Sequence, residues 1–152
     1  MKITLSIFLL SLILISCNSG VKNKKEEKDY TSNEVHKMIK MNCYTCHNPN
    51  SESHDAILAP PFIAVKRRYK MEFDNKEEFV RAMSEFTYVP SIDTYLMKGA
   101  VNKFGLMPRT ALSKKQLEFV AEYIWENDLE EPEWFQEHFE EEHGEVENSG
   151  TK

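Results

Sequence analysis

The sequence predicts an all-α domain of about four to five helices. Three segments carry a helix-capping pattern, in which Ser, Thr or Asp is followed three residues later by Glu or Gln. The pairs are Thr31 with Glu34, Asp74 with Glu77, and Ser113 with Gln116. Behind each pair, apolar residues recur at intervals of three and four, which is the spacing of one face of an α-helix. Prolines and glycines separate these segments, so we expect short helices joined by loops.

The first helix is expected to begin at Thr31 and to end in the motif Cys43-Tyr44-Thr45-Cys46-His47. One of its faces carries residues at the helical spacing. These residues are Val35, Met38, Ile39, Asn42 and Cys43. His36 lies off this face, and we expect it to be solvated.

The pattern C-x-x-C-H is typical of the attachment site of a c-type haem. In such a site the two thiols, here Cys43 and Cys46, add across the two vinyl groups of the porphyrin. The histidine that follows, His47, then lies under the iron as its proximal ligand. The motif by itself leaves two alternatives open. A zinc site would use the two cysteines with His47 or His54, and a redox site would use the thiols as a disulfide pair.

Residues 48–61 are expected to form a loop, because they are rich in Asn, Ser and Pro and because Pro60 and Pro61 cannot continue a helix. We expect His54 in this loop to be solvated. A short helix over residues 63–70 follows. Its basic side chains form either a solvated face or a patch for an acidic partner. They are Lys66, Arg67, Arg68 and Lys70.

The helix that Asp74 opens is expected to end at Val89-Pro90. Its apolar face consists of Phe79, Ala82, Met83 and Phe86. A further short helix is expected over residues 91–100, ending near Gly99. Residues 102–108 then form a loop with an apolar centre. The last helix begins at Ser113, and its apolar face consists of Leu117, Val120, Ala121 and Ile124, widened by Phe119, Tyr123 and Trp125.

Residues 1–16 are expected to form a signal peptide, because Lys2 precedes an apolar run that is shorter than the roughly 20 residues of a spanning helix. The end of the run, Leu14-Ile15-Ser16-Cys17, resembles the bacterial lipobox. That resemblance implies cleavage before Cys17 and acylation of this residue. An ordinary secretory signal is the alternative. The polar residues 17–30 are expected to be a flexible tether.

Residues 128–152 are expected to be an acidic tail, because glutamates crowd this part of the chain. Trp134, Phe135 and Phe139 are candidates to pack its first turns against the domain. Over its 152 residues the chain has a formal net charge of −6, and no basic stripe stands out. A nucleic-acid-binding role is therefore not expected.

The order of these features resembles that of a small bacterial monohaem class I cytochrome c, over residues 31–127. The resemblance implies the class I cytochrome c fold around one covalent haem c. Cys43 and Cys46 would form the thioethers, and His47 would be the proximal ligand. Pro60 would offer its carbonyl to the other ring nitrogen of His47. Met107, which lies between Gly105 and Pro108 in a loop, would be the distal ligand, with Met97 as the alternative.

The resemblance further implies a one-electron carrier rather than an enzyme. It would work in a respiratory or other periplasmic chain, between donor and acceptor proteins that the sequence does not name. Acylation of Cys17 would anchor it to a lipid membrane in the bacterial cell envelope, with the haem domain outside the cytoplasm. The alternatives are a haem-based sensor or enzyme with a labile sixth ligand, a fixed subunit of a larger oxidoreductase, and a zinc-binding lipoprotein.

Overall fold

The computed structural model describes residues 29–144, and within this range the chain forms α-helices, one short 3-10 helix and no β-strand. The elements are α2 (Ser32–Asn42), η1 (His54–Ala56), α3 (Phe62–Glu72), α4 (Lys76–Tyr88), α5 (Lys98–Phe104), α6 (Lys114–Glu126) and α7 (Phe135–His143). The prediction of an all-α fold is confirmed. Five of the α-helices fall between residues 31 and 127, and α7 follows them.

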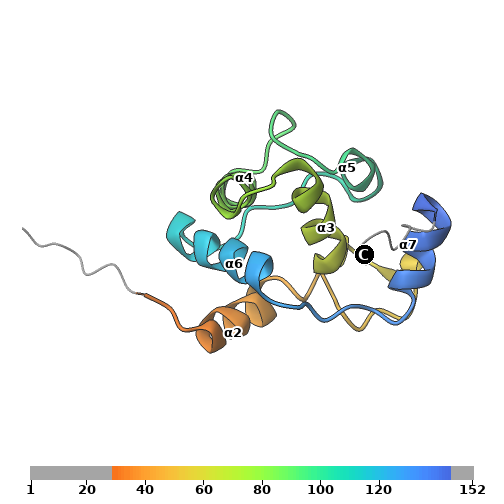
Figure 1. The fold of residues 1–152 in the computed structure, drawn as a ribbon, viewed down its shortest axis with the longest axis horizontal. Coiled ribbons are helices and arrows are strands. Elements are labelled where there is room, and N and C mark those ends of the chain that lie inside the picture. Colours follow the sequence, from red (N-terminus) through yellow and green to blue (C-terminus); the bar gives the residue numbers. More distant parts are fainter. Residues whose placement is uncertain (1–28, 145–152) are drawn as a thin grey trace, which may run out of the picture.

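The core lies where α4 and α2 pack against α6, with α3 contacting both α4 and α6 (Figure 1). Phe79 and Met83 of α4 are buried there, and Val35 and Ile39 cover α6 from α2. The face of α6 that the sequence analysis expected to be apolar is buried as a whole. Its members are Leu117, Val120, Ala121 and Ile124. In the view of Figure 1, α7 lies at the opposite end of the molecule from α2 and α4.

Two of the three predicted capping boxes are formed. The Thr31 N–H donates to the Glu34 carboxylate at 2.9 Å, while the Thr31 hydroxyl accepts the Glu34 N–H at 3.4 Å. Ser113 and Gln116 make the same reciprocal pair at the start of α6. The third prediction was wrong by one residue. Asn75, not Asp74, caps α4, and its side chain accepts the N–H of Glu78 at 2.9 Å; Asn and Asp serve equally well at this position.

The helix expected over residues 91–100 is not present. Ser91 instead begins a turn, in which its hydroxyl accepts the N–H of Asp93 at 3.1 Å and its carbonyl accepts the N–H of Thr94 at 3.3 Å. Such local side-chain bonds compete with helix formation. The helix α5 begins later, runs through Gly99, and ends at Gly105, whose φ of 80° lies in the left-handed region that glycine adopts readily.

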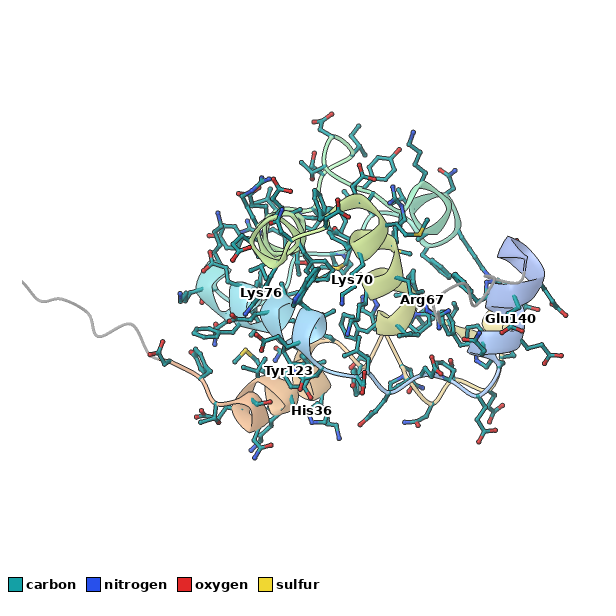
Figure 2. The ribbon with its side chains drawn as sticks, viewed as in Figure 1. His36, Arg67, Lys70, Lys76, Tyr123 and Glu140 are labelled. Atoms are coloured by element: carbon teal, nitrogen blue, oxygen red, sulfur yellow. The ribbon has the colours of Figure 1, made fainter. Side chains whose placement is uncertain are left out.

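Two histidines expected to be solvated are engaged in ring contacts. His36 is only partly exposed and stacks on Tyr123 of α6, with the ring centroids 5.6 Å apart (Figure 2). His54 stacks on His138 of α7 at 4.0 Å. The expectation that aromatic residues pack the first turns of the acidic tail against the domain is confirmed, because α7 is helical, Phe135 is buried and Trp134 donates to Ser51. Residues 145–152 of the predicted tail lie outside the described residues.

Candidate metal centre

The motif Cys43-Tyr44-Thr45-Cys46-His47 forms a tight turn at the end of α2. The N–H of Cys43 donates to the carbonyl of Ile39 at 2.8 Å, which completes the last turn of the helix. The carbonyl of Cys43 then accepts the N–H of Cys46 at 3.1 Å and that of His47 at 2.9 Å. This turn brings both thiols and the imidazole to the same side of the helix end. Cys43 is partly buried, Cys46 is exposed, and both are free thiols.

A cavity of about 260 Å³ lies beside this turn, and the residues expected to hold or orient a haem all line it. They are Cys43, Cys46, His47, Pro60 and Met107. Most of the remaining wall is apolar and comes from α3, α4, α5 and α6. It includes Phe62, Tyr69, Met83, Leu117, Val120 and Ile124. Residues far apart in the sequence therefore converge on one apolar space.

The imidazole of His47 is oriented by two neighbours. Its Nδ1 lies 2.6 Å from the carbonyl oxygen of Pro60, which is the contact that the resemblance implied. A carbonyl oxygen can only accept a hydrogen bond, so in the neutral ring Nδ1 carries the proton and Nε2 keeps its lone pair. The ring also stacks on Phe62, with centroids 4.7 Å apart. Burial lowers the pKa of His47, against a smaller opposing effect of the Pro60 hydrogen bond, and this favours the neutral ligand form.

The cavity also favours the neutral form of Cys43. Burial, and to a smaller extent the neighbouring Cys46, raise the pKa of the Cys43 thiol to about 11. Thiols that act in redox exchange have pKa values lowered by nearby positive charge or a helix N-terminus. Cys43 instead lies at the C-terminal end of α2. Its surroundings are therefore unlike those of a catalytic redox pair.

The loop that carries Met107 leaves regular structure as predicted, but it begins at Gly105 and not at residue 102, because α5 extends to Phe104. Its far end is attached to α4, because Arg109 donates to the carbonyl of Tyr88 at 3.1 Å and lies over the Tyr88 ring. Met107 is partly buried and lines the cavity. Met97, at the N-cap of α5, lines the same cavity. The structure thus brings both candidate thioethers to the site.

Phe62, Val65 and Tyr69 of α3 were not predicted to be part of the site, although all three line the cavity. Their intervals of three and four residues place them on one helix face, which is the signal that could have found them. Tyr69 is 3% exposed. Phe62 stacks on the His47 ring, and Val65 and Tyr69 form further parts of the cavity wall.

The zinc alternative is not supported by the placement of the side chains. Within residues 29–144, no group of three or more His, Cys, Asp or Glu side chains is arranged to hold a metal ion. His54, the additional ligand available to that alternative, stacks on His138.

The basic residues of α3 make contacts within the chain. Lys66 donates to the carbonyl of Asn127 at 2.6 Å, and Arg68 pairs with Glu72 at 3.0 Å.

Cys17 and the predicted signal peptide lie outside the described residues. Among the helices of residues 29–144, none has the length and apolar character needed to cross a membrane.

Comparison with protein-family models matches the chain to the cytochrome c family over residues 32–128. This range holds the C-x-x-C-H motif, Pro60, Met97 and Met107, and it includes α2 to α6. Comparisons with curated proteins and with solved structures gave no match.

Proposed function

The chain belongs to the cytochrome c family, whose members carry covalently bound haem c and use it in electron transfer, and from this premise we propose that it is a one-electron carrier with a His/Met-ligated haem. We place it in a respiratory or other periplasmic chain of a bacterium. The observation that carries the proposal is the convergence of two thiols, an imidazole and a thioether on one apolar cavity. This set of groups is the one that attaches and ligates a c-type haem.

The residues of the cavity fit the roles proposed for them. Cys43 and Cys46 would form the two thioether bonds, and His47, with Nε2 left free by the Pro60 contact, would be the proximal ligand. Met107 would supply the distal thioether. When bound, the haem supplies a ferric/ferrous couple. A soft thioether and an apolar wall both disfavour the extra charge of the ferric form, so the chain is expected to give the couple a raised potential.

Covalent attachment is tested by whether the haem stays with the denatured chain. The wild-type protein, matured in cells with a c-type haem assembly system, is expected to keep its haem through acid denaturation and extraction with organic solvent. The double variant Cys43→Ala/Cys46→Ala is expected to release any haem that it binds. Cys17→Ala removes the third cysteine and is expected to retain the haem. A wild-type chain that gives up its haem, or that binds zinc in its place, contradicts the proposal.

A sixth position filled by Met107 separates a carrier from a gas sensor or an enzyme with a labile ligand. In that case, adding carbon monoxide to the ferrous protein at neutral pH is expected to cause no change in the visible spectrum. Rapid formation of a carbon monoxide adduct by the wild-type protein would favour the sensor or enzyme. Stoichiometric co-purification with one oxidoreductase would favour a fixed subunit.

The lipobox-like sequence before Cys17 supports a membrane anchor in the bacterial cell envelope, with the haem domain outside the cytoplasm. Three acyl chains exceed the two signals that stable anchoring needs. The wild-type protein is expected to enter the detergent phase in a detergent partition, and Cys17→Ala is expected to stay in the aqueous phase. Equal partition of the two proteins would show that Cys17 does not carry the anchor.

A further inference from the structure

The segment after Asp128 lies beyond the range of the family match, yet it packs against the part of the chain that presents Pro60. We propose that Trp134 in this segment is a positioning residue for the proximal ligand, because it holds the loop of residues 48–61 and thereby keeps the Pro60 carbonyl on Nδ1 of His47. The inference rests on the proposed function, since its consequence is a change in the properties of a haem bound through His47.

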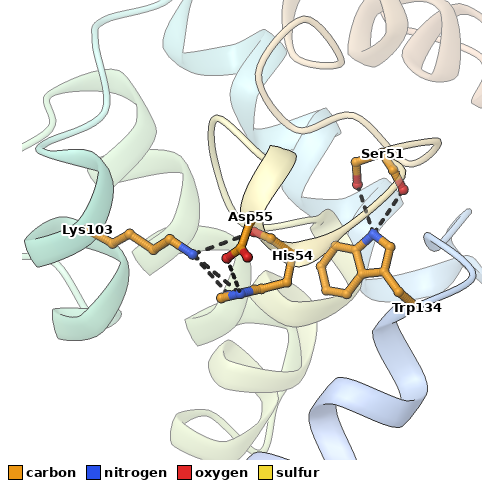
Figure 3. Close-up of polar contacts among 5 residues, drawn as sticks. All are labelled: Ser51, His54, Asp55, Lys103 and Trp134. Atoms are coloured by element: carbon orange, nitrogen blue, oxygen red, sulfur yellow. Dashed lines mark hydrogen bonds and ion pairs between the residues drawn. The ribbon is translucent and has the colours of Figure 1, made fainter.

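Trp134 contacts the loop directly. Its indole N–H donates to the carbonyl of Ser51 at 2.9 Å, with the Ser51 hydroxyl at 3.3 Å (Figure 3). The edge of the indole meets the ring of His54, with centroids 5.7 Å apart. One turn further along, His138 of α7 stacks on the same His54 ring at 4.0 Å. The indole and the imidazole of His138 therefore hold the loop from one side.

The same segment is attached to α3, the helix that begins directly after Pro61. The guanidinium of Arg67 lies 5.0 Å from the ring centroid of Phe135 and 4.5 Å from that of Phe139. Arg67 also donates to the side chain of Gln136 at 2.9 Å, and Figure 2 shows it reaching from α3 toward α7. Phe135 is 3% exposed. Residues on both sides of Pro60 are thus joined to one C-terminal unit.

Before Pro60, residues 48–59 are held within the loop by local contacts alone. Its turns are closed by local hydrogen bonds, from the N–H of Asn50 to the Asn48 side chain and from the N–H of Ala56 to the carbonyl of Ser53. Pro60 and Pro61 have no N–H to donate. From elsewhere in the chain, Lys103 of α5 also reaches His54, at 3.3 Å from its Nε2 (Figure 3). On its C-terminal side Pro60 is followed by Pro61, which is buried and whose carbonyl accepts the N–H of Ala64 at 3.0 Å at the start of α3. On the other side, residues 48–59 are held by contacts from distant segments, among them the 2.9 Å bond from Trp134 to the Ser51 carbonyl.

Pro60 lies in the wall between two spaces. It lines the metal-centre cavity on one side, and on the other it lines a groove of about 1850 Å³ that Trp134 and His138 also line. Trp134 does not line the metal-centre cavity. An effect of Trp134 on the site is therefore indirect, and the loop that Trp134 contacts leads to the Pro60 carbonyl.

The direction of the effect follows from the hydrogen bond of His47. A firm Nδ1–H bond to a carbonyl makes the imidazole a stronger electron donor, which favours ferric iron. If the loop becomes more mobile, this hydrogen bond weakens on average, and the ferrous form becomes more stable relative to the ferric form. Loss of the Trp134 contact is therefore expected to raise the reduction potential.

The test uses the full-length haem-loaded protein with Trp134→Phe, which removes the N–H and keeps a ring, and with Trp134→Ala. We expect the ferrous/ferric ratio at a fixed applied potential to rise by about threefold or more in Trp134→Ala, which is about 28 mV for one electron. A smaller rise is expected in Trp134→Phe. Amide hydrogen exchange of residues 48–59 is measured in parallel, and it is expected to be faster in both variants.

Trp125→Phe is the matched control. Trp125 is also partly buried and packs on Phe79 at 5.0 Å, but it touches neither the loop nor the metal-centre cavity. It is expected to leave the potential and the loop exchange unchanged. A potential that stays constant in Trp134→Ala while exchange accelerates would reduce the contact to a structural role and overturn the inference. A lowered potential, which marks entry of water, or unchanged exchange would overturn it as well.

Failure of the proposed function would be visible separately. It would show as a wild-type chain without covalent haem, before any potential is measured.

Discussion

His47, Cys43 and Tyr69 show how burial sets the chemistry of single residues in the cavity. Burial lowers the pKa of His47, raises the pKa of Cys43 to about 11, and raises the pKa of Tyr69 to about 12. In each case the environment disfavours the charged form. The same low polarity disfavours the additional charge of ferric iron, which is why we expect a raised potential. The protonation of these residues and the expected redox property have one physical cause.

Tyr69 makes the free energy of unfolding depend on pH in the alkaline range. Its folded pKa of about 12 lies above the ordinary value of 10.0, so between these values the unfolded chain loses its proton first. The contribution of Tyr69 to the free energy of unfolding is fully present below pH 10. It is lost as the pH rises toward 12, by up to about 1.4 kcal/mol per pH unit. Tyr69→Phe is expected to lack this part of the slope when urea unfolding is followed at a series of pH values.

Identical slopes for wild type and Tyr69→Phe would show that the buried phenol does not control the alkaline loss of stability.

At this scale the sequence predicted the residues of a local motif and failed on contacts between distant segments. Cys43, Cys46 and His47 are adjacent in the chain, and local turn geometry suffices to bring them together. The stacking of His36 on Tyr123 depends on how α2 packs against α6. The residues next to His36 in the sequence do not predict this contact. His36 keeps a side-chain exposure of 31%, so it is partly and not fully solvated.

The packing of α4 on α6 is the main contact between elements. Phe79 of α4 is fully buried and meets the rings of Tyr69 and Trp125 edge-on, with centroids 5.7 Å and 5.0 Å away. The aromatic cluster thus links α3, α4 and α6. Tyr69 is shared between this cluster and the cavity wall, so the core supports the site directly.

Phe79→Ala is expected to lower the free energy of unfolding by about 3–5 kcal/mol, because the variant leaves a cavity among three helices. Urea unfolding of the haem-loaded protein, followed by circular dichroism, measures the change. Met71→Ala on α3 is the control, since Met71 is 77% exposed, and it is expected to change stability by less than about 0.5 kcal/mol. Similar losses for the two variants would contradict the assignment of Phe79 to the core.

Helix existence could be predicted well and helix boundaries less well. The face of α6 and the capping boxes at Thr31 and Ser113 follow from spacing and residue type alone. The region after Pro90 could not be resolved in this way, because Ser91 offers the backbone a turn that competes with a helix. A helix was therefore predicted over residues 91–100, whereas α5 begins only at Lys98.

For the molecule as a whole, the arrangement of helices matters because it gathers the motif, the proline loop and the methionine loop around one cavity. That convergence was expected from the resemblance to a known family and not from periodicity. The C-terminal segment was harder to predict. Its glutamates indicate a solvated tail, while the spacing of Phe135 and Phe139 indicates a helix face. In the structure both hold, since Phe135 is buried and Glu137, Glu140, Glu141 and Glu142 are exposed.

The central claim is a haem iron held between His47 and Met107, and a visible absorption spectrum of the oxidised and reduced protein tests it most directly. We expect a sharp c-type spectrum on reduction and, in the oxidised form, a weak sulfur-to-iron charge-transfer band. Met107→Ala is expected to abolish that band and keep the covalent haem. Met97 also lines the cavity, and Met97→Ala is expected to keep both the charge-transfer band and the covalent haem. A band that persists in Met107→Ala, or that is lost in Met97→Ala, would contradict the claim.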